Sequence, residues 1–288
     1  TAAGTGLVRC VCSGTGDSSV VSELGPSEQT GAEPRGSAPA TPAAAGHVTG
    51  GRPYYGAVAG VLVFDSTTPR VPGDPGHAAT FPFPVVYEVV HGFTFNDLQT
   101  YDPVTLTPVL DAVLRLQDKG VHFIIADCGL FSLYQREISA ALHVPFIGSS
   151  LSLIPFIQAS VSPAQTVGVI TGHSAYLSRA HLEAVGVDME SVAIEGMENC
   201  AEFVRVVING GPDLNVDALR AGTLDAAARL RERVSHLGAL ILECPNLATF
   251  RSDLVGLLGI PVFDVVSVAE LFAAALKLEG FPRLYPHR

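Results

Sequence analysis

The sequence has few basic residues, few cysteines and no long uninterrupted apolar run. Its 288 residues contain 17 Lys and Arg against 28 Asp and Glu, a formal net charge of −11. Binding to a nucleic-acid backbone requires clustered Lys and Arg, and no basic cluster is present, so we expect no nucleic-acid partner. The five cysteines do not make a disulfide framework, which favours a reducing compartment. We expect an intracellular soluble protein of the plastid or the cytoplasm.

The longest stretch without Asp, Glu, Lys or Arg runs over residues 138–178, which is long enough to cross a bilayer if it were continuously apolar. Pro145, Pro155 and Pro163 instead divide it into pieces of strand and helix length. We therefore predict the buried middle of an α/β protein and no membrane partner.

Residues 1–52 are rich in Gly, Ala, Ser, Thr and Pro and poor in large apolar residues. This composition cannot bury enough surface to offset the cost of ordering, so we expect a disordered or loosely attached arm, which can be the remnant of a plastid-type leader. Cys10 and Cys12 lie in this arm without a second pair of cysteines, and we predict no metal site.

From residue 53 onward, strand-like and helix-like patterns alternate, which predicts parallel sheets with helices on both faces. We expect two pseudo-symmetric Rossmann-like lobes with the active site in the cleft between them, one formed by residues 53–155 plus 262–288 and the other by residues 156–261. The expected strands lie at residues 57–64, 83–90, 121–126, 144–147, 166–171, 192–195, 239–242 and 261–265. The expected helices lie at residues 106–119, 130–142, 174–185, 216–235 and 267–278, and one further helix ends at residue 258.

Two short units dominate the sequence. Ile124–Leu130 and Leu240–Asn246 each place an acidic residue and then a cysteine, Cys128 or Cys244, after an apolar run. The cysteines are 116 residues apart, and each is followed 17 residues later by a proline in a short apolar segment. Because ligands bind at the carboxyl ends of parallel strands, the two thiols are predicted to face one site.

Each thiol has a plausible means of activation, because a helix N-terminus favours thiolate over thiol. A free cysteine is more often a small buried hydrophobe, and we assign Cys200 to that class. Asp127 and Glu243 directly precede the two paired cysteines, and nearby carboxylates raise a thiol pKa. Either these side chains point away or they orient a protonated partner.

A long polar loop over residues 65–81 follows the first strand. Loops of this length often cover or line a site. Arg70, Asp74, His77 and Thr80 lie in it among Pro and Gly residues that restrict the backbone. The loop is therefore a candidate part of the site, with a plain surface excursion as the alternative.

The paired units resemble those of the aspartate/glutamate/hydantoin racemase superfamily over about residues 55–278. The resemblance implies two facing cysteines between two α/β lobes and no cofactor, with one thiolate removing the proton α to a carboxylate. These roles fall on Cys128 and Cys244. The amino-acid racemases usually show Asn-Thr after the first cysteine and Thr or Ser after the second, whereas Gly129-Leu130 and Pro245-Asn246 stand here.

The loop sequence from Pro69 to Asp74, with Thr80-Phe81 and the two cysteine units, is more similar to a branch that includes algal dimethylsulfoniopropionate lyases of the Alma type. This resemblance implies a cofactor-independent β-elimination that releases dimethyl sulfide and acrylate, with Cys244 as base and Cys128 as opposed partner. The substrate would be a small zwitterion or carboxylate, and we expect a homo-oligomer. A two-cysteine racemase and a non-catalytic small-carboxylate binding protein are the alternatives.

Candidate substrate ligands follow from this chemistry. Aromatic faces hold a sulfonium cation, and backbone amides or hydroxyls hold a carboxylate. The aromatic candidates are Tyr87, Phe93, Tyr101 and Tyr134. The carboxylate candidates are Gly129, Leu130, Leu247, Ser149, Ser150 and Thr80, and further candidates at the cleft are Arg70, Asn246 and His173.

Overall fold

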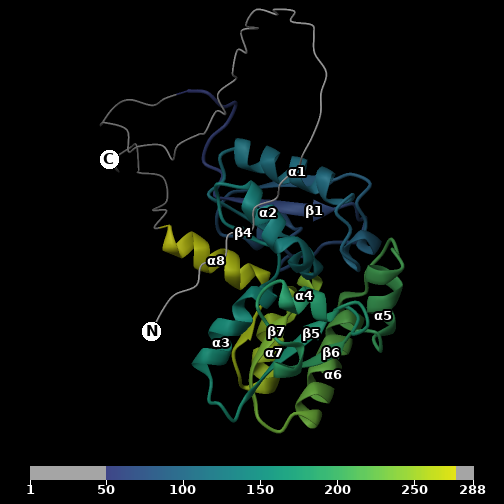
Figure 1. The fold of residues 1–288 in the computed structure, drawn as a ribbon. Coiled ribbons are helices and arrows are strands. Elements are labelled where there is room, and N and C mark those ends of the chain that lie inside the picture. The colour runs from purple at the N-terminus through teal and green to yellow at the C-terminus, as the bar shows by residue number, and fades with distance from the viewer. Residues whose placement is uncertain (1–49, 277–288) are drawn as a thin grey trace, which may run out of the picture. The chain divides into compact units, whose positions relative to one another are not determined.

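Two parallel four-stranded sheets carry the fold in the computed structural model, which describes residues 50–276 (Figure 1). Of these, residues 52–276 belong to one compact unit that begins at Arg52. The first sheet has the order β2-β1-β3-β4 and consists of β1 (Ala59–Phe64), β2 (Val85–Val90), β3 (Phe123–Ala126) and β4 (Phe146–Ile147). The second has the order β6-β5-β7-β8 and consists of β5 (Thr166–Thr171), β6 (Val192–Gly196), β7 (Leu237–Leu242) and β8 (Val262–Phe263).

Helices connect the strands because parallel neighbours need crossover connections. The α-helices are α1 (Leu106–Asp118), α2 (Gln135–Ala141), α3 (Ile154–Ser160), α4 (Arg179–Glu183), α5 (Ala201–Phe203), α6 (Val216–Arg233), α7 (Arg251–Leu258) and α8 (Val265–Ala275). The 3₁₀ turns are η1 (Ala78–Thr80), η2 (Phe95–Leu98), η3 (Gly129–Tyr134), η4 (Ser150–Leu153), η5 (Met189–Ser191) and η7 (Pro245–Phe250), and the π-helical turn η6 spans Val204–Ile208. The prediction of an α/β protein with two similar lobes and parallel sheets is confirmed.

The 116-residue repeat is visible in the backbone. Adding 116 to the bounds of η3 gives the bounds of η7, and adding 116 to those of β4 gives those of β8. The strands before the cysteines, β3 and β7, occupy the same third place in their sheets. The two cysteine units are therefore equivalent parts of two equivalent lobes.

The sequence predicts that the chain returns to the first lobe at residue 262. Strand β8 begins there and pairs with β7, so this strand belongs to the second sheet. The helix that follows it, α8, packs on the first sheet (Figure 1). The rings of Phe272 in α8 and Phe123 in β3 lie 5.6 Å apart. A strand of one lobe is thus followed directly by a helix of the other.

The helices differ from the prediction in several places, and two of these differences have a clear physical reason. The helix expected over residues 174–185 is helical only in α4, because His173 and Ser174 form side-chain hydrogen bonds to Ala175 N–H and to Glu198 that hold a turn instead. Helix α3 is not among the predicted helices, because the prediction treats Pro155 as a break. Proline is compatible with the first turn of a helix, where it stands in α3.

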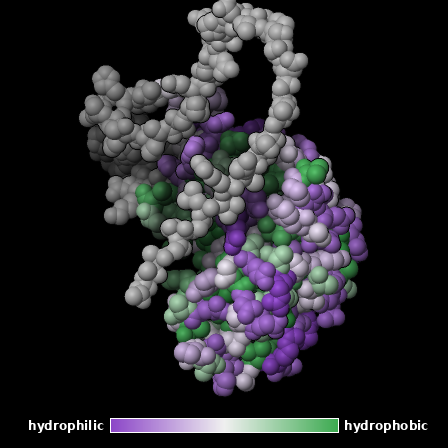
Figure 2. Space-filling model, in the orientation of Figure 1, coloured by the Kyte–Doolittle hydropathy of each residue, from purple (hydrophilic) through white to green (hydrophobic). Residues whose placement is uncertain are grey.

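The expected arm of residues 1–52, including Cys10 and Cys12, lies almost entirely outside the described residues. Among residues 50–276, no helix is both long enough and apolar enough to cross a membrane. The face drawn in Figure 2 mixes hydrophilic and hydrophobic residues, with hydrophilic ones predominating over α6.

Candidate active site

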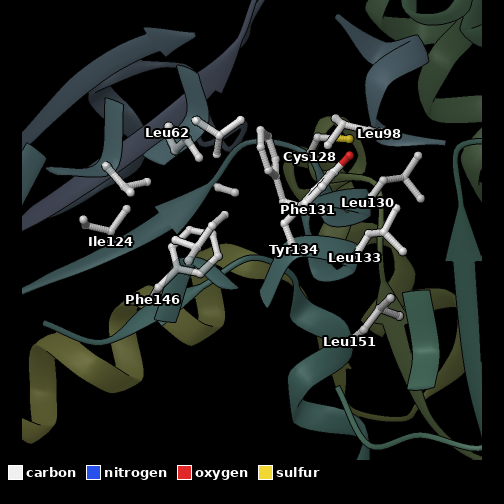
Figure 3. Close-up of a cluster of buried hydrophobic side chains, with 14 of the residues drawn as sticks. Leu62, Leu98, Ile124, Cys128, Leu130, Phe131, Leu133, Tyr134, Phe146 and Leu151 are labelled. Atoms are coloured by element: carbon white, nitrogen blue, oxygen red, sulfur yellow. The ribbon is translucent and has the colours of Figure 1, made fainter. Parts of the chain in front are cut away.

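Cys128 and Cys244 line one pocket. Each follows the end of a buried strand and is the N-cap residue of a 3₁₀ turn, η3 or η7. The pocket contains about 430 Å³ of space between atoms, part of it open to solvent. Figure 3 shows Cys128 next to Leu98 and Leu130, within a cluster of buried apolar side chains. The equivalent strand ends of the two lobes therefore bring both thiols to the same space.

Both thiols favour the protonated form. Burial raises the pKa of Cys128 well above its ordinary value, and the carboxylate of Glu243 raises it further. The same two causes raise the pKa of Cys244. Backbone N–H groups of Leu130 and Asn246 oppose these shifts at the two sulfurs, as expected at the start of a helical turn. Formation of a thiolate therefore needs a further favourable charge in the pocket.

Asp127 is buried in an ion pair with Arg70. Arg70 Nη2 lies 2.7 Å from Asp127 Oδ2, and its Nη1 lies 3.0 Å from Asp74 Oδ1. Burial raises the pKa of Asp127 to about 7, although Arg70 opposes this shift. The guanidinium is shared by two carboxylates, so the cluster carries no surplus positive charge for a substrate carboxylate.

Glu243 also turns toward the pocket and does not point away from it. Its Oε2 accepts a hydrogen bond of 2.7 Å from Thr171 Oγ1, and burial raises its pKa to about 7. A Cβ atom added at Gly129 would collide with both the backbone oxygen and the carboxylate of Glu243. Glu243, which precedes Cys244 in sequence, therefore lies against the turn that begins at the other cysteine.

Asn246 connects the second cysteine to the long loop of the first lobe. Its carbonyl Oδ1 lies 3.5 Å from the Cys244 sulfur, and its Nδ2 donates a 2.7 Å hydrogen bond to Asp74 Oδ2. Thr249 Oγ1 donates a second hydrogen bond, of 2.6 Å, from the second lobe to the oxygen of Pro72. The loop over residues 65–81 is therefore docked beside the pocket by side chains of η7.

The aromatic wall of the pocket consists of residues that the sequence analysis did not select. Phe64, Phe95, Tyr176 and Phe203 all line the pocket. The rings of Phe95 and Tyr176 are 5.4 Å apart, and those of Tyr176 and His173 are 4.3 Å apart. These residues come from the end of β1, from η2, from the turn before α4 and from α5, so no local pattern links them in sequence.

The candidate residues divide into two groups. Those that line the pocket are Cys128, Leu130, His173, Cys244 and Asn246. Those that do not are Gly129, Ser149, Ser150, Leu247, Thr80, Arg70, Tyr87, Phe93, Tyr101 and Tyr134.

Most of the second group have structural partners. Ser150 Oγ donates to the oxygen of Leu242, and Ser149 caps η4. Thr80 donates to the Asp74 oxygen within the long loop. The hydroxyl of Tyr87 donates to the Pro75 oxygen.

The remaining aromatic candidates pack away from the pocket. Tyr134 is buried, and its hydroxyl donates to the Asp97 oxygen. Phe93 stacks on Phe131, with ring centroids 5.6 Å apart, and the Tyr101 ring lies 5.4 Å from that of Tyr134.

Metal binding does not follow from this arrangement. Within residues 50–276, no three His, Cys, Asp or Glu side chains are grouped closely enough to hold a metal ion.

Comparison with known proteins identifies related sequences. The Asp/Glu/Hydantoin racemase family matches residues 85–271, more than half of the chain. A protein of Durusdinium sp. clade D named dimethylsulfoniopropionate lyase is 28% identical over 221 residues, which cover 74% of this chain and 73% of the relative. Dimethylsulfoniopropionate lyase 7 of Emiliania huxleyi is 26% identical over 228 residues, which cover 75% of this chain and 66% of the relative, slightly less than two thirds of its length.

Solved structures share the fold. An arylmalonate decarboxylase superposes with a TM-score of 0.52 at 16% identity, covering 77% of this chain and 93% of the other. A glutamate racemase from Bacillus anthracis superposes with a TM-score of 0.50 at 14% identity, covering 76% of this chain and 81% of the other. At these identities the likeness concerns the two-lobed fold alone.

Proposed function

The chain belongs to the Asp/Glu/hydantoin racemase family, and from that premise we propose that it is a cofactor-independent lyase that cleaves dimethylsulfoniopropionate into dimethyl sulfide and acrylate. The pair of thiols at equivalent strand ends, both lining one pocket, is the observation that supports this proposal most directly. Relatives named for this activity support the choice of substrate.

The proposed reaction is a β-elimination. The thiolate of Cys244 removes the proton from the carbon next to the substrate carboxylate, and that C–H electron pair becomes the second bond of the acrylate double bond. The C–S bond breaks with its electron pair remaining on sulfur, so the sulfonium leaves as neutral dimethyl sulfide. The abstracted proton stays on Cys244 until solvent takes it, and Cys128 faces the substrate as the opposed thiol.

The charge of the substrate is suited to this pocket. Both thiols are protonated at rest, and a neighbouring cation favours the charged form of an acid. A sulfonium group bound against the aromatic wall would therefore promote ionisation of Cys244 when the substrate is present. The substrate carboxylate is expected at the backbone N–H groups that begin η3, where Leu130 lines the pocket and Gly129 does not.

The test is turnover of dimethylsulfoniopropionate by the purified protein, with headspace dimethyl sulfide and dissolved acrylate measured together. We expect Cys244→Ser to lower turnover by about a thousandfold. Cys200→Ser is the matched control, because Cys200 is buried at the start of α5 and does not line the pocket. Near-normal turnover in both Cys244→Ser and Cys128→Ser would refute thiol catalysis.

A racemase that uses both thiols is the second candidate, because Cys128 and Cys244 line the same pocket from opposite lobes. Exchange of the α hydrogen of an amino acid for deuterium, without release of dimethyl sulfide, would support it. Saturable binding of a small carboxylate without either reaction would indicate a non-catalytic binding protein.

A further inference from the structure

The acidic residues before the two cysteines are held in equivalent ways. Asp127 accepts a hydrogen bond of 3.2 Å from the backbone N–H of Phe64. Phe64 lies just beyond Leu62, the last residue of β1 that pairs with β3. Glu243 accepts one from the backbone N–H of Gly172, at the equivalent point of the second sheet. The repeat thus directs both carboxylates to the pocket.

The two carboxylates differ in their countercharge. Asp127 lies 2.7 Å from the guanidinium of Arg70, whereas the side-chain partner of Glu243 is the neutral hydroxyl of Thr171. Among residues 50–276, no Lys or Arg forms an ion pair with Glu243. A buried carboxylate without a cation either holds a proton or binds a cation that comes from solution.

The surroundings of Glu243 are suited to one class of cation. Phe64, Phe95, Tyr176 and Phe203 present aromatic surface to the same pocket, and aromatic faces attract cations. A sulfonium or quaternary ammonium ion has no N–H groups, so it needs no set of hydrogen-bond acceptors. A carboxylate beside aromatic rings is therefore sufficient to recognise it.

We propose that Glu243 is the anion that pairs with the sulfonium group of the substrate and makes the pocket select an onium compound over its neutral thioether. This inference rests on the proposed function for the identity of the substrate. Glu243 is then a specificity-determining residue, separate from the thiol that takes the proton. The absence of a Cβ at Gly129 is what leaves room for its carboxylate.

Protonation of Glu243 must be coupled to cation binding. Burial raises its pKa to about 7, and a bound cation lowers that pKa, so the proton leaves as the cation enters. The other titratable or charged groups that face this space are Asp127 and Cys128 after β3, Cys244 after β7, and His173 and Tyr176 after β5, with Arg70 behind Asp127. The thiols can also release a proton, so a Glu243 variant is needed to show which group releases the proton on cation binding.

The experiment measures binding of trimethylsulfonium ion to the full chain by titration calorimetry at neutral pH. We expect Glu243→Gln to weaken this binding by about tenfold or more, while acrylate binds no more weakly. Glu243→Asp keeps the charge and should retain part of the affinity. Glu190→Gln is the matched control, since Glu190 is exposed and pairs with Arg179 away from the pocket.

A second measurement on the unsubstituted protein keeps the proposal falsifiable if the Gln variant fails to fold, because binding without release of a proton would overturn it. Titrations at pH 6.5 in two buffers of different ionisation enthalpy should show a proton released on trimethylsulfonium binding. The same release in a folded Glu243→Gln protein would assign it to a thiol and overturn the proposal.

The proposal and the lyase function fail separately. Dimethyl sulfide release with trimethylsulfonium affinity unchanged in Glu243→Gln would refute the role of Glu243 and leave the lyase function intact. Glu243-dependent binding of trimethylsulfonium without dimethyl sulfide release would support the role of Glu243 and refute the lyase function.

Discussion

Asn246 donates a 2.7 Å hydrogen bond from its side-chain amide to Asp74, a residue 172 positions earlier in the chain. A carboxylate can only accept, so the NH₂ group of Asn246 must face Asp74 and its carbonyl oxygen must face the Cys244 sulfur, 3.5 Å away. That oxygen can accept a hydrogen bond from a thiol but cannot donate one to a thiolate. The bond between the lobes therefore stabilises the protonated form of Cys244.

Replacing Asn246 by Ala should lower the thiol pKa of Cys244, because it removes the acceptor of the S–H proton without changing any charge. The loss of one hydrogen bond of about 1 kcal/mol corresponds to a shift of roughly 0.7 pH units. The pH dependence of iodoacetamide alkylation, followed on the Cys244 peptide by mass spectrometry, measures this shift. Thr249→Val is the control, because it removes the contact of η7 with Pro72 and leaves the amide in place. An unchanged or raised pKa in Asn246→Ala would contradict the explanation.

Loss of Arg70 should destabilise the protein strongly. Arg70 is the ion-pair partner of Asp127 and Asp74, whose side chains are almost fully buried. Arg70→Leu leaves both without a countercharge, and breaking a buried pair from one side costs about 3–5 kcal/mol of unfolding free energy. Arg179→Leu, which removes an exposed pair with Glu190, should cost at most about 1 kcal/mol. Urea denaturation of the two variants gives the comparison, and equal losses would contradict a structural role for the Arg70 cluster.

Much of the framework was predictable from sequence because its signals are local. The apolar runs before Cys128 and Cys244, and the proline 17 residues after each, mark the strands and turns that the structure contains. The repeat also predicted that both thiols would meet one site, and both line the pocket.

The wall of the pocket was not predictable by the same means. Phe64, Tyr176 and Phe203 meet only through tertiary packing, and nothing in the local sequence distinguishes them from core aromatics such as Tyr134. The partners of Asp127 and Glu243 were equally hidden, since Arg70 lies 57 residues from the first and Thr171 lies 72 residues from the second.

Stability should fall as the pH rises from about 4.5 to about 7. Burial raises the pKa of Glu243 to about 7 in the folded protein, so it holds a proton over this range that the unfolded chain has already released. This group can contribute a slope of up to about 1.4 kcal/mol per pH unit, with no further contribution above pH 7. Glu243→Gln should make the decline shallower, and urea denaturation at pH 5, 6 and 7 measures both slopes. Stability that rises with pH over this range, or an unchanged slope in the variant, would contradict the raised pKa of Glu243.

Gly129 should be intolerant of even a methyl group. A Cβ at this position would collide with the backbone oxygen and the carboxylate of Glu243, and the backbone oxygen cannot move without shifting the chain between β7 and Cys244. Gly129→Ala should therefore lower both stability and turnover, with a stability loss of about 1–3 kcal/mol. Gly256→Ala is the matched substitution, because Gly256 lies within α7 and a Cβ there has no neighbour within 4 Å. It should raise stability by about 0.5–1 kcal/mol and leave turnover unchanged, since alanine loses less backbone entropy than glycine in a helix. If Gly129→Ala instead behaves like Gly256→Ala in thermal unfolding and in turnover, the close contact between Glu243 and the first cysteine turn is not needed for the site.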